Sequence, residues 1–187
     1  MEFIKIAIYG KAKSGKDTFA NLLMNEFEKK LPSDELIFHT AFAEPIKRFV
    51  WSLFPGEFSQ TSLFGPSQNR ENKILGTELS YRQLLCDMGE LLKKYDPDIW
   101  INKTFQTIDD KIKETQRVII KESSWQLSTS FIKGISYQPV KTRAFIISDL
   151  RFKREYDALK TQNYFLIKLI RPDNDYFSNH CSETELE

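Results

Sequence analysis

The chain has 187 residues, a formal net charge of +1 and an apolar fraction of 41%, which suit one globular domain with a sizeable core. A net charge this close to zero gives no general attraction to nucleic acid or membranes, and no run of 18 apolar residues is present to cross a bilayer. Two cysteines, Cys86 and Cys181, fit no paired or metal-binding spacing, which indicates a reducing compartment such as the cytoplasm.

The first expected element is a strand over residues 3–9, short, rich in isoleucine and apolar on both faces, as in a parallel sheet. It lacks the basic start of a signal peptide. A glycine-rich turn follows, and apolar residues then recur at helical spacing over residues 19–31. A second strand is expected over residues 36–42 and an amphipathic helix over residues 46–54.

The middle of the chain is less regular. Residues 55–79 are polar with scattered Gly and Pro, which predicts a long loop of the kind that is usually functional or disordered. Ser80 with Gln83 three residues later predicts a capping box and a helix after it. Asp98 is expected to cap the next helix, and residues 106–143 give the weakest pattern, with short β-like runs that suggest a hairpin insertion.

The last third returns to a clear alternation. Residues 144–149 predict a buried strand that ends in an acid, residues 152–159 a helix with Phe152, Tyr156 and Leu159 inward, and residues 164–170 a final strand. Alternating strands and helices predict an α/β sandwich of three layers, with a mostly parallel sheet and helices on both faces.

The stretch GKAKSGKDT, residues 10–18, nearly matches the phosphate-loop pattern G-x-x-x-x-G-K-[ST]. In such a loop consecutive backbone N–H groups and the helix N-terminus face an anion, and the lysine adds a point charge. A strand before it and a helix after it are the context that the motif requires. The alternative is a tight turn with surface lysines.

Three oxygen-bearing side chains are candidates for Mg²⁺. Asp17 takes the place where the pattern has a hydroxyl residue, in a helical first turn that favours an acid, and Thr18 follows with a hydroxyl. Asp149, at the end of a buried strand, has the usual position of an acid that orients Mg²⁺. The alternative for Asp149 is an N-cap of a helix that starts at Leu150.

Several arginines follow predicted helix starts, where a cation opposes the helix dipole unless an anion is bound. Arg151 and Arg154 are three residues apart and so would share a face, which predicts phosphate contact, although Glu155 offers Arg151 another partner. Arg82, in the first turn after Ser80, is placed to clamp a second anion. Arg70 lies in the loop and is the weaker candidate.

Seven segments taken together resemble phage-type deoxynucleoside monophosphate kinases, and the resemblance covers most of the chain except roughly residues 106–142. In chain order they are GKAKSGKDT, FAEPIK, LFGPSQNREN, YRQLLCDMGELLKKYDPDIW, ISDLRFKREYDAL, IKLIRP and NHCSETEL. In that family the loop resembles G-x-x-x-S-G-K-D-T, so Asp17 is the family's own form and Thr18 takes the hydroxyl role.

The resemblance implies a single P-loop kinase domain over residues 1–187, with an acceptor-binding region at about 43–105 and an insertion at about 106–142. It implies transfer of a phosphoryl group from ATP, with Mg²⁺, to a deoxynucleoside 5′-monophosphate. The cofactors are then ATP and Mg²⁺, the partners are these small molecules rather than nucleic acid or membrane, and the location is the cytoplasm, of the host cell if the protein is phage-encoded.

Residue roles follow the motif positions. Catalysis falls to Lys16, Arg151 and Asp149, and Mg²⁺ to Thr18, Asp17 and Asp149. The donor-binding set is Gly10, Lys13, Ser14, Gly15, Lys16, Asp17, Thr18, Arg154 and Arg171. The acceptor-binding set is Arg70, Arg82, Trp100 and Glu44.

Two departures and three alternatives stand beside this assignment. Cys86 occupies a position where many family members carry glutamine. The chain stops at Glu187, where relatives continue, which predicts an adenine pocket open on one side that accepts GTP or dATP, with the tail around His180 beside it. Animal phosphomevalonate kinases share related motifs, a non-catalytic nucleotide-binding module is a second alternative, and nucleic-acid binding through the basic stretches near residues 111–143 is the third. The oligomeric state is open, a homodimer included.

Overall fold

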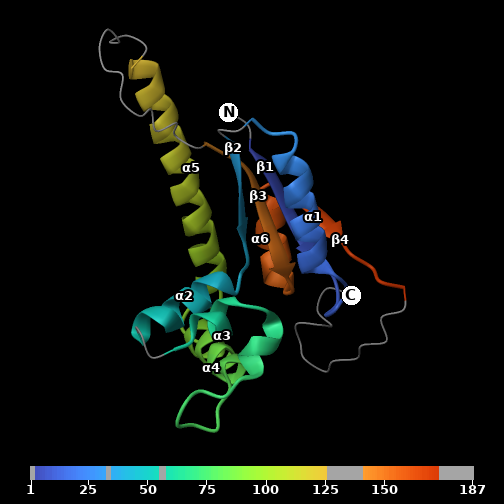
Figure 1. The fold of residues 1–187 in the computed structure, drawn as a ribbon, viewed down its shortest axis with the longest axis vertical. Coiled ribbons are helices and arrows are strands. Elements are labelled where there is room, and N and C mark those ends of the chain that lie inside the picture. Colours follow the sequence, from blue (N-terminus) through green and yellow to red (C-terminus); the bar gives the residue numbers. More distant parts are fainter. Residues whose placement is uncertain (1–2, 33–34, 55–57, 126–140, 173–187) are drawn as a thin grey trace. The chain divides into compact units, whose positions relative to one another are not determined.

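The computed structural model describes residues 3–32, 35–54, 58–125 and 141–172. The chain divides into two compact units (Figure 1). Unit 1 combines Met1–Thr40 with Phe105–Glu187, and unit 2 is Ala41–Thr104. The predicted acceptor-binding region, about 43–105, covers nearly the same residues as unit 2, and its role stays a prediction.

Unit 1 contains a four-stranded sheet in which all neighbouring strands are parallel. Its strands are β1 (Ile4–Tyr9), β2 (Glu35–Thr40), β3 (Lys141–Leu150) and β4 (Phe165–Lys168), in the spatial order β2-β3-β1-β4. The central strands β1 and β3 are apolar on both faces, as a covered parallel sheet requires. The predicted α/β class with a parallel sheet is confirmed.

Two crossover helices connect these strands. Helix α1 (Lys16–Glu28) joins β1 to β2 and buries Ala20 in a core cluster with Ile6, Ile8 and Ile146. Helix α6 (Lys153–Thr161) joins β3 to β4 and buries Leu159. Because β2 and β4 lie on opposite sides of the β3–β1 pair, these two connections run in opposite directions. Right-handed crossovers in opposite directions place their helices on opposite faces, which fits a three-layer sandwich.

Unit 2 is helical in the residues that the structure describes. Its core holds Val50, Leu63 and Tyr81, with Phe58, Leu84 and Met88 packed against them. Its elements are α2 (Glu44–Leu53), α3 (Gln60–Phe64), the 3-10 helix η1 (Ser67–Glu71), α4 (Tyr81–Lys93) and the first residues of α5 (Ile99–Trp125).

The structure corrects two sequence-based predictions. The expected hairpin is wrong for residues 106–125, because α5 continues without a break to Trp125, while residues 126–140 of the expected insertion lie outside the described residues. The expected loop over residues 55–79 contains α3 and η1, and its residues 55–57 are also outside the described part.

The predicted capping box at α4 is half confirmed. The Ser80 hydroxyl accepts a hydrogen bond from the Gln83 backbone N–H at 3.2 Å, so Ser80 caps the helix. The Gln83 side chain donates instead to the Asp87 carboxylate, at 2.7 Å. Among the described residues, no helix has the length and apolar character that a membrane span needs.

Candidate phosphate-binding site

The loop of residues 10–15 begins where β1 runs closest to the end of β4. The Leu169 backbone N–H donates to the Tyr9 carbonyl at 2.8 Å. Gly10 has a φ of +151°, and a Cβ built there would lie 2.4 Å from the Leu169 carbonyl oxygen. Only glycine fits this backbone and this approach, so the first glycine of the motif is required by the fold of unit 1 itself.

The loop then turns tightly through residues with positive φ. The Ser14 N–H donates to the Lys11 carbonyl at 3.1 Å, and Lys13 has a φ of +60°. Gly15 follows at +92° as the N-cap of α1, and glycine has no side chain to accept a hydrogen bond from the first turn. The first N–H groups of a helix have no partner within the helix, so this end presents donors to an anion.

The side chains of Lys16 and Arg171 donate hydrogen bonds to backbone carbonyls of the loop. The Lys16 ammonium donates to the carbonyls of Gly10 (2.6 Å) and Lys11 (2.7 Å), so the cation lies within the curl of the loop. The Arg171 guanidinium, beyond β4, donates to the Lys13 carbonyl at 3.3 Å. The Ser14 hydroxyl oxygen is buried and has no hydrogen-bond partner among the described residues. The loop therefore curls around the Lys16 ammonium, which two of the loop carbonyls bind.

The predicted Mg²⁺ ligands Asp17 and Thr18 lie in the first turn of α1 and are exposed. Within the described residues, neither side chain makes a hydrogen bond or ion pair, so their oxygens are available to a ligand. The described residues contain no cluster of three or more His, Cys, Asp or Glu able to hold a metal by itself. A cation here would need further oxygens from a bound phosphate or from water.

Asp149 lies in β3 next to the start of the loop. Tyr9 of β1 pairs with Leu150, and between that pair and the Ala7–Ile147 pair β3 has one residue more than β1. Such a bulge changes the direction of nearby side chains. The alternative N-cap role for Asp149 is wrong, because β3 continues to Leu150 and α6 begins only at Lys153.

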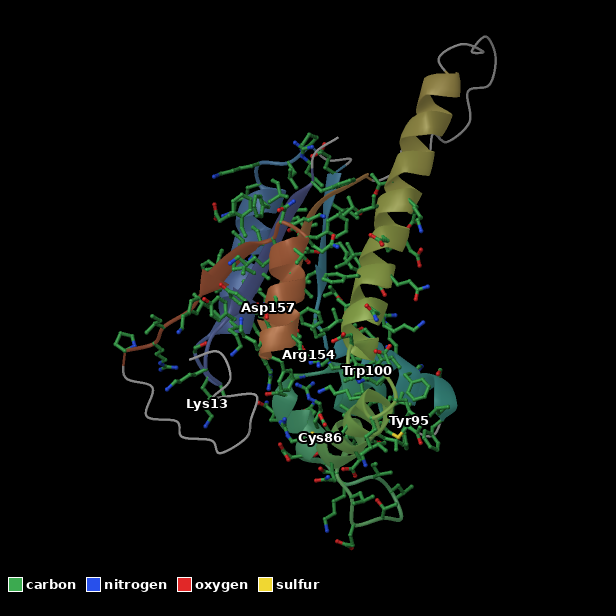
Figure 2. All side chains as sticks on the ribbon, turned by 180° about the vertical axis from the view of Figure 1, so that it is seen from behind. Lys13, Cys86, Tyr95, Trp100, Arg154 and Asp157 are labelled. Carbon is green, nitrogen blue, oxygen red and sulfur yellow. The ribbon has the colours of Figure 1, made fainter. Side chains whose placement is uncertain are left out.

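Helix α6 is closed at its start by Glu155. The Glu155 carboxylate accepts from the backbone N–H groups of Arg151 (2.9 Å) and Phe152 (3.0 Å), and the glutamate is 8% exposed. Arg151 therefore precedes the helix instead of lying in its first turn, and the expected shared helical face with Arg154 is wrong. Arg154 lies in the first turn of α6 (Figure 2).

The positions of Asp149 and Arg151 are set by the carboxyl end of β3. In open parallel sheets, ligands bind at the carboxyl ends of adjacent strands whose connections leave in opposite directions. In unit 1 that pair is β1 and β3. The glycine-rich loop follows the carboxyl end of β1, while Asp149 lies at the carboxyl end of β3 and Arg151 follows it. The topology therefore brings the predicted donor-binding loop and these two predicted catalytic residues to one edge of the sheet.

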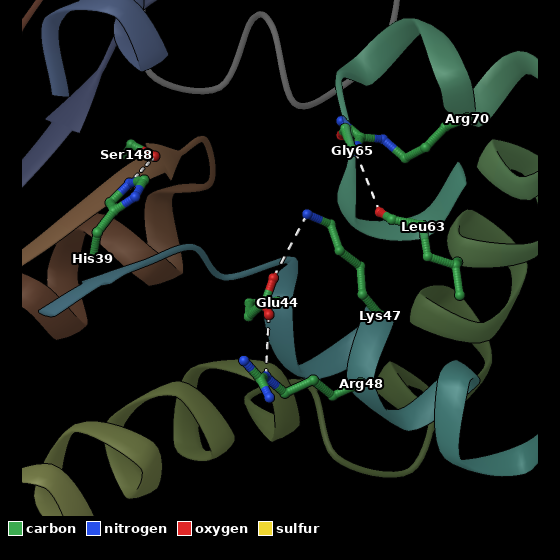
Figure 3. A network of polar contacts seen from close by, with 8 residues as sticks. All are labelled: His39, Glu44, Lys47, Arg48, Leu63, Gly65, Arg70 and Ser148. Atoms are coloured by element: carbon green, nitrogen blue, oxygen red, sulfur yellow. Dashed lines mark hydrogen bonds and ion pairs between the residues drawn. The ribbon is translucent and has the colours of Figure 1, made fainter. Parts of the chain in front are cut away.

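Sequence reasoning missed a contact beside Asp149. His39, near the end of β2, and Ser148 of β3 join through Nε2 and Oγ at 2.8 Å (Figure 3). Ser148 is only 3% exposed, so His39 supplies the hydrogen bond that a buried hydroxyl requires. The two residues are 109 apart in sequence, and only the strand register brings them together.

Tyr9, the last residue of β1, packs edge to face against Tyr156 of α6, with ring centroids 5.8 Å apart. The Lys168 ammonium lies 6.0 Å from the Tyr9 ring centroid. Burial raises the pKa of Tyr9, and the neighbouring Tyr156 raises it further. The phenol beside the loop therefore stays neutral at physiological pH and does not repel a phosphate.

In unit 2 the predicted acceptor residues Glu44 and Trp100 have structural partners. Glu44 forms ion pairs with Arg48 (3.1 Å) and Lys47 (3.7 Å), all on α2 (Figure 3). Trp100 is 6% exposed, and its indole N–H donates to the Gly89 carbonyl at 3.1 Å. The indole thereby ties α5 to α4, and a substrate-binding role for Trp100 or Glu44 stays a prediction.

The two predicted acceptor arginines both contact the segment between α3 and α4. Arg70 of η1 donates to the carbonyls of Gly65 (3.2 Å) and Leu63 (3.5 Å). Arg82 of α4 forms an ion pair with Glu71 and donates from Nη2 to the Ser67 carbonyl at 3.2 Å. Arg82 is thus already held by a carboxylate, and its predicted role of clamping a second anion stays a prediction.

No protein-family model matches the chain, and a search of curated protein sequences finds no match either. The resemblance to deoxynucleoside monophosphate kinases therefore remains a prediction from the motifs.

Proposed function

We propose that the protein is a kinase that transfers a phosphoryl group from Mg·ATP to a deoxynucleoside 5′-monophosphate. The observation that carries the proposal is the loop of residues 10–18. It encloses the Lys16 cation and leads into a helix start without a side-chain cap, and the strand before it pairs with β3, which carries Asp149 next to its last residue. Such a loop suits the phosphates of a nucleoside triphosphate.

The donor phosphates would bind to the N–H groups of the first turn of α1 and to the Lys16 ammonium. Lys16 would exchange its contacts with the Gly10 and Lys11 carbonyls for phosphate oxygens, wholly or in part. Arg151 and Arg154 would add charge from the start of α6. Phosphoryl transfer requires mainly positioning and charge neutralisation, which fits a site rich in cations and backbone donors.

The residues at this edge fit a magnesium ion. Mg²⁺ prefers hard oxygen ligands and keeps several waters, and Asp17, Thr18 and Asp149 supply carboxylate and hydroxyl oxygens without forming a closed cage. Asp17, Thr18 and Asp149 would hold the ion, and its charge would offset the negative charge of the phosphates. The chain's own part is to hold the triphosphate and to exclude water.

The acceptor assignment rests on the motif resemblance and on the arginines of unit 2. Arg82 and Arg70 would hold the 5′-phosphate of the acceptor, because a guanidinium pairs well with a phosphate dianion. The same cations would suit another phosphate monoester, so phosphomevalonate remains the competing acceptor.

A panel of acceptors tests the proposal. Purified protein is mixed with ATP, Mg²⁺ and one candidate acceptor at a time, and ADP release is followed. The acceptors are the deoxynucleoside 5′-monophosphates, the ribonucleoside 5′-monophosphates and phosphomevalonate. We expect ADP only with one or more deoxynucleotides, and none with Lys16→Ala. Lys29→Ala, an exposed lysine in the C-cap position of the same helix, is the matched control. ADP release with phosphomevalonate alone would change the acceptor, and no release with any compound would refute the kinase assignment.

A further inference from the structure

Arg82 is held at one edge by two partners from one short segment. Glu71, the last residue of η1, contacts Nε of the guanidinium, and the Ser67 carbonyl accepts from Nη2 at 3.2 Å. The side chains of Arg82 and Glu71 are 47% and 60% exposed. An ion pair this exposed contributes little to stability, so its effect on the free energy of unfolding does not explain it.

The geometry leaves the other part of the guanidinium available. A guanidinium has five N–H donors in a fixed plane, and these two contacts use two of them. Within the described residues Arg82 makes no other hydrogen bond or ion pair, so three donors, including both on Nη1, remain for a ligand. Two adjacent donors are what bidentate binding of a phosphate requires.

Glu71 has two opposite effects on such a ligand. Its negative charge repels a phosphate, but the two groups would lie on different edges of the guanidinium, in water, where such repulsion is weak and screened. Its hydrogen bond fixes a side chain that otherwise loses rotamer freedom on binding. Whether orientation outweighs repulsion decides the sign of the effect of Glu71 on phosphate binding, and we take orientation as the larger effect.

We propose that Glu71 is a positioning residue, which orients Arg82 to bind the phosphate monoester of the acceptor. The proposal rests on the proposed function for the identity of the acceptor. In this proposal Arg82 contacts the anion. Glu71 orients Arg82 through the side-chain oxygen that accepts a hydrogen bond from Nε, and the charge of Glu71 is not needed.

Two substitutions separate orientation from charge. Glu71→Ala removes both, and Glu71→Gln removes the charge but keeps an oxygen that accepts from Nε. Binding is measured by calorimetry with each of the four common deoxynucleoside 5′-monophosphates and with inorganic phosphate. Glu78→Ala is the control, because Glu78 makes the same kind of exposed ion pair, with Lys73, in the same unit. The NMR signal of Arg82 Nε–H, assigned with Arg82→Lys, reports on the guanidinium directly.

We expect Glu71→Ala to weaken deoxynucleotide binding about two- to twelvefold, the effect of one disordered arginine, and Glu71→Gln to stay within about twofold of the wild type. The acceptor KM should follow these changes while the ATP KM does not. Tighter binding in both variants would show that Glu71 competes with the phosphate and would overturn the proposal. Equal binding by the wild type and Glu71→Ala would overturn it as well.

The Arg82 signal separates this proposal from the kinase assignment. If deoxynucleotide or phosphate shifts the signal in the wild type but no ADP is released, the anion contact stands and the kinase assignment fails. If ADP is released with deoxynucleotides while the signal stays unmoved, the kinase assignment stands and the role of Glu71 fails. If neither phosphate nor any deoxynucleotide binds, the proposal for Glu71 is overturned.

Discussion

Gly10→Ala tests whether Gly10, the first residue of the phosphate loop, packs against the backbone at the end of β4. The new Cβ would lie 2.4 Å from the Leu169 carbonyl oxygen and 2.9 Å from the Ser14 hydroxyl oxygen. The nearer atom is backbone, so it cannot rotate away as the tip of a side chain can. The fold must therefore separate β4 from the loop or accept the clash.

Two costs add at this position. Forcing extra volume into a packed contact costs about 1–3 kcal/mol. A non-glycine residue in a sparsely populated region of positive φ costs about 1–3 kcal/mol more. Gly10→Ala should therefore lower the free energy of unfolding by about 2–6 kcal/mol, a large share of the total for an ordinary domain.

Gly15→Ala supplies the matched control. Gly15 also has a positive φ, +92°, but a Cβ there would meet no atom within 4 Å. Gly15→Ala should therefore lower the free energy of unfolding only by the cost of the positive φ, about 1–3 kcal/mol. The assay is urea unfolding of both variants and the wild type, followed by circular dichroism. Equal losses in the two variants, or a Gly10→Ala variant as stable as the wild type, would refute the close approach of Leu169 to the loop.

Four further substitutions test the site and its surroundings. Lys16→Ala should abolish ADP release, while the free energy of unfolding measured in urea changes by about 1 kcal/mol or less. Full turnover would show that the lysine does not contact the donor. Asp149→Asn should lower kcat and raise the Mg²⁺ concentration for half-maximal rate, with little change in stability because Glu155 closes the start of α6; a loss of stability alone would show a structural role. His39→Ala should cost about 1–3 kcal/mol by leaving the buried Ser148 hydroxyl without its partner, and His39→Gln less, because its amide can restore the bond; equal losses would contradict this contact. Tyr164→Phe should stabilise the fold by about 1–3 kcal/mol, since the Tyr164 hydroxyl is buried and has no partner among the described residues; a destabilised variant would show that the hydroxyl is bonded.

The Tyr164→Phe substitution should also change how stability depends on pH. Burial raises the pKa of Tyr164 above its ordinary value of 10.0, and the charge of Asp109 adds to the effect. The unfolded chain then releases the phenol proton near pH 10 while the folded chain retains it. Wild-type stability should therefore fall as pH rises above about 10, by at most about 1.4 kcal/mol per pH unit from this group. Unfolding curves of Tyr164→Phe should fall less steeply, and parallel curves would contradict the assignment.

The sequence was sufficient for the local features of the fold. Isoleucine-rich strands, the spacing of apolar residues in α1 and the Ser80 cap were predicted because each depends on neighbours within a few residues. The path of α5 was not. Residues 118–120 are Val, Ile and Ile, which favour strands by propensity, yet the helix that begins at Ile99 continues through them.

The candidate site divides in the same way. The loop of residues 10–18 was found because its motif is contiguous, and the strand-end position of Asp149 follows from one apolar run. His39 with Ser148, and Arg82 with Glu71, join residues 109 and 11 apart. Such pairs depend on strand register and on the turn between two helices, which no periodic pattern in one sequence encodes. The expected open adenine pocket depends on the tail around His180, which lies outside the described residues.

The most direct test of the phosphate-loop assignment is an NMR titration of ¹⁵N-labelled protein with Mg·ATP. If the loop holds the phosphates, the backbone N–H signals of Gly15, Lys16, Asp17 and Thr18 should shift most, because these groups lie at the uncapped start of α1. In Lys16→Ala the same titration should require far more ATP. Binding of ATP that leaves these four signals in place, while others shift, would contradict the account.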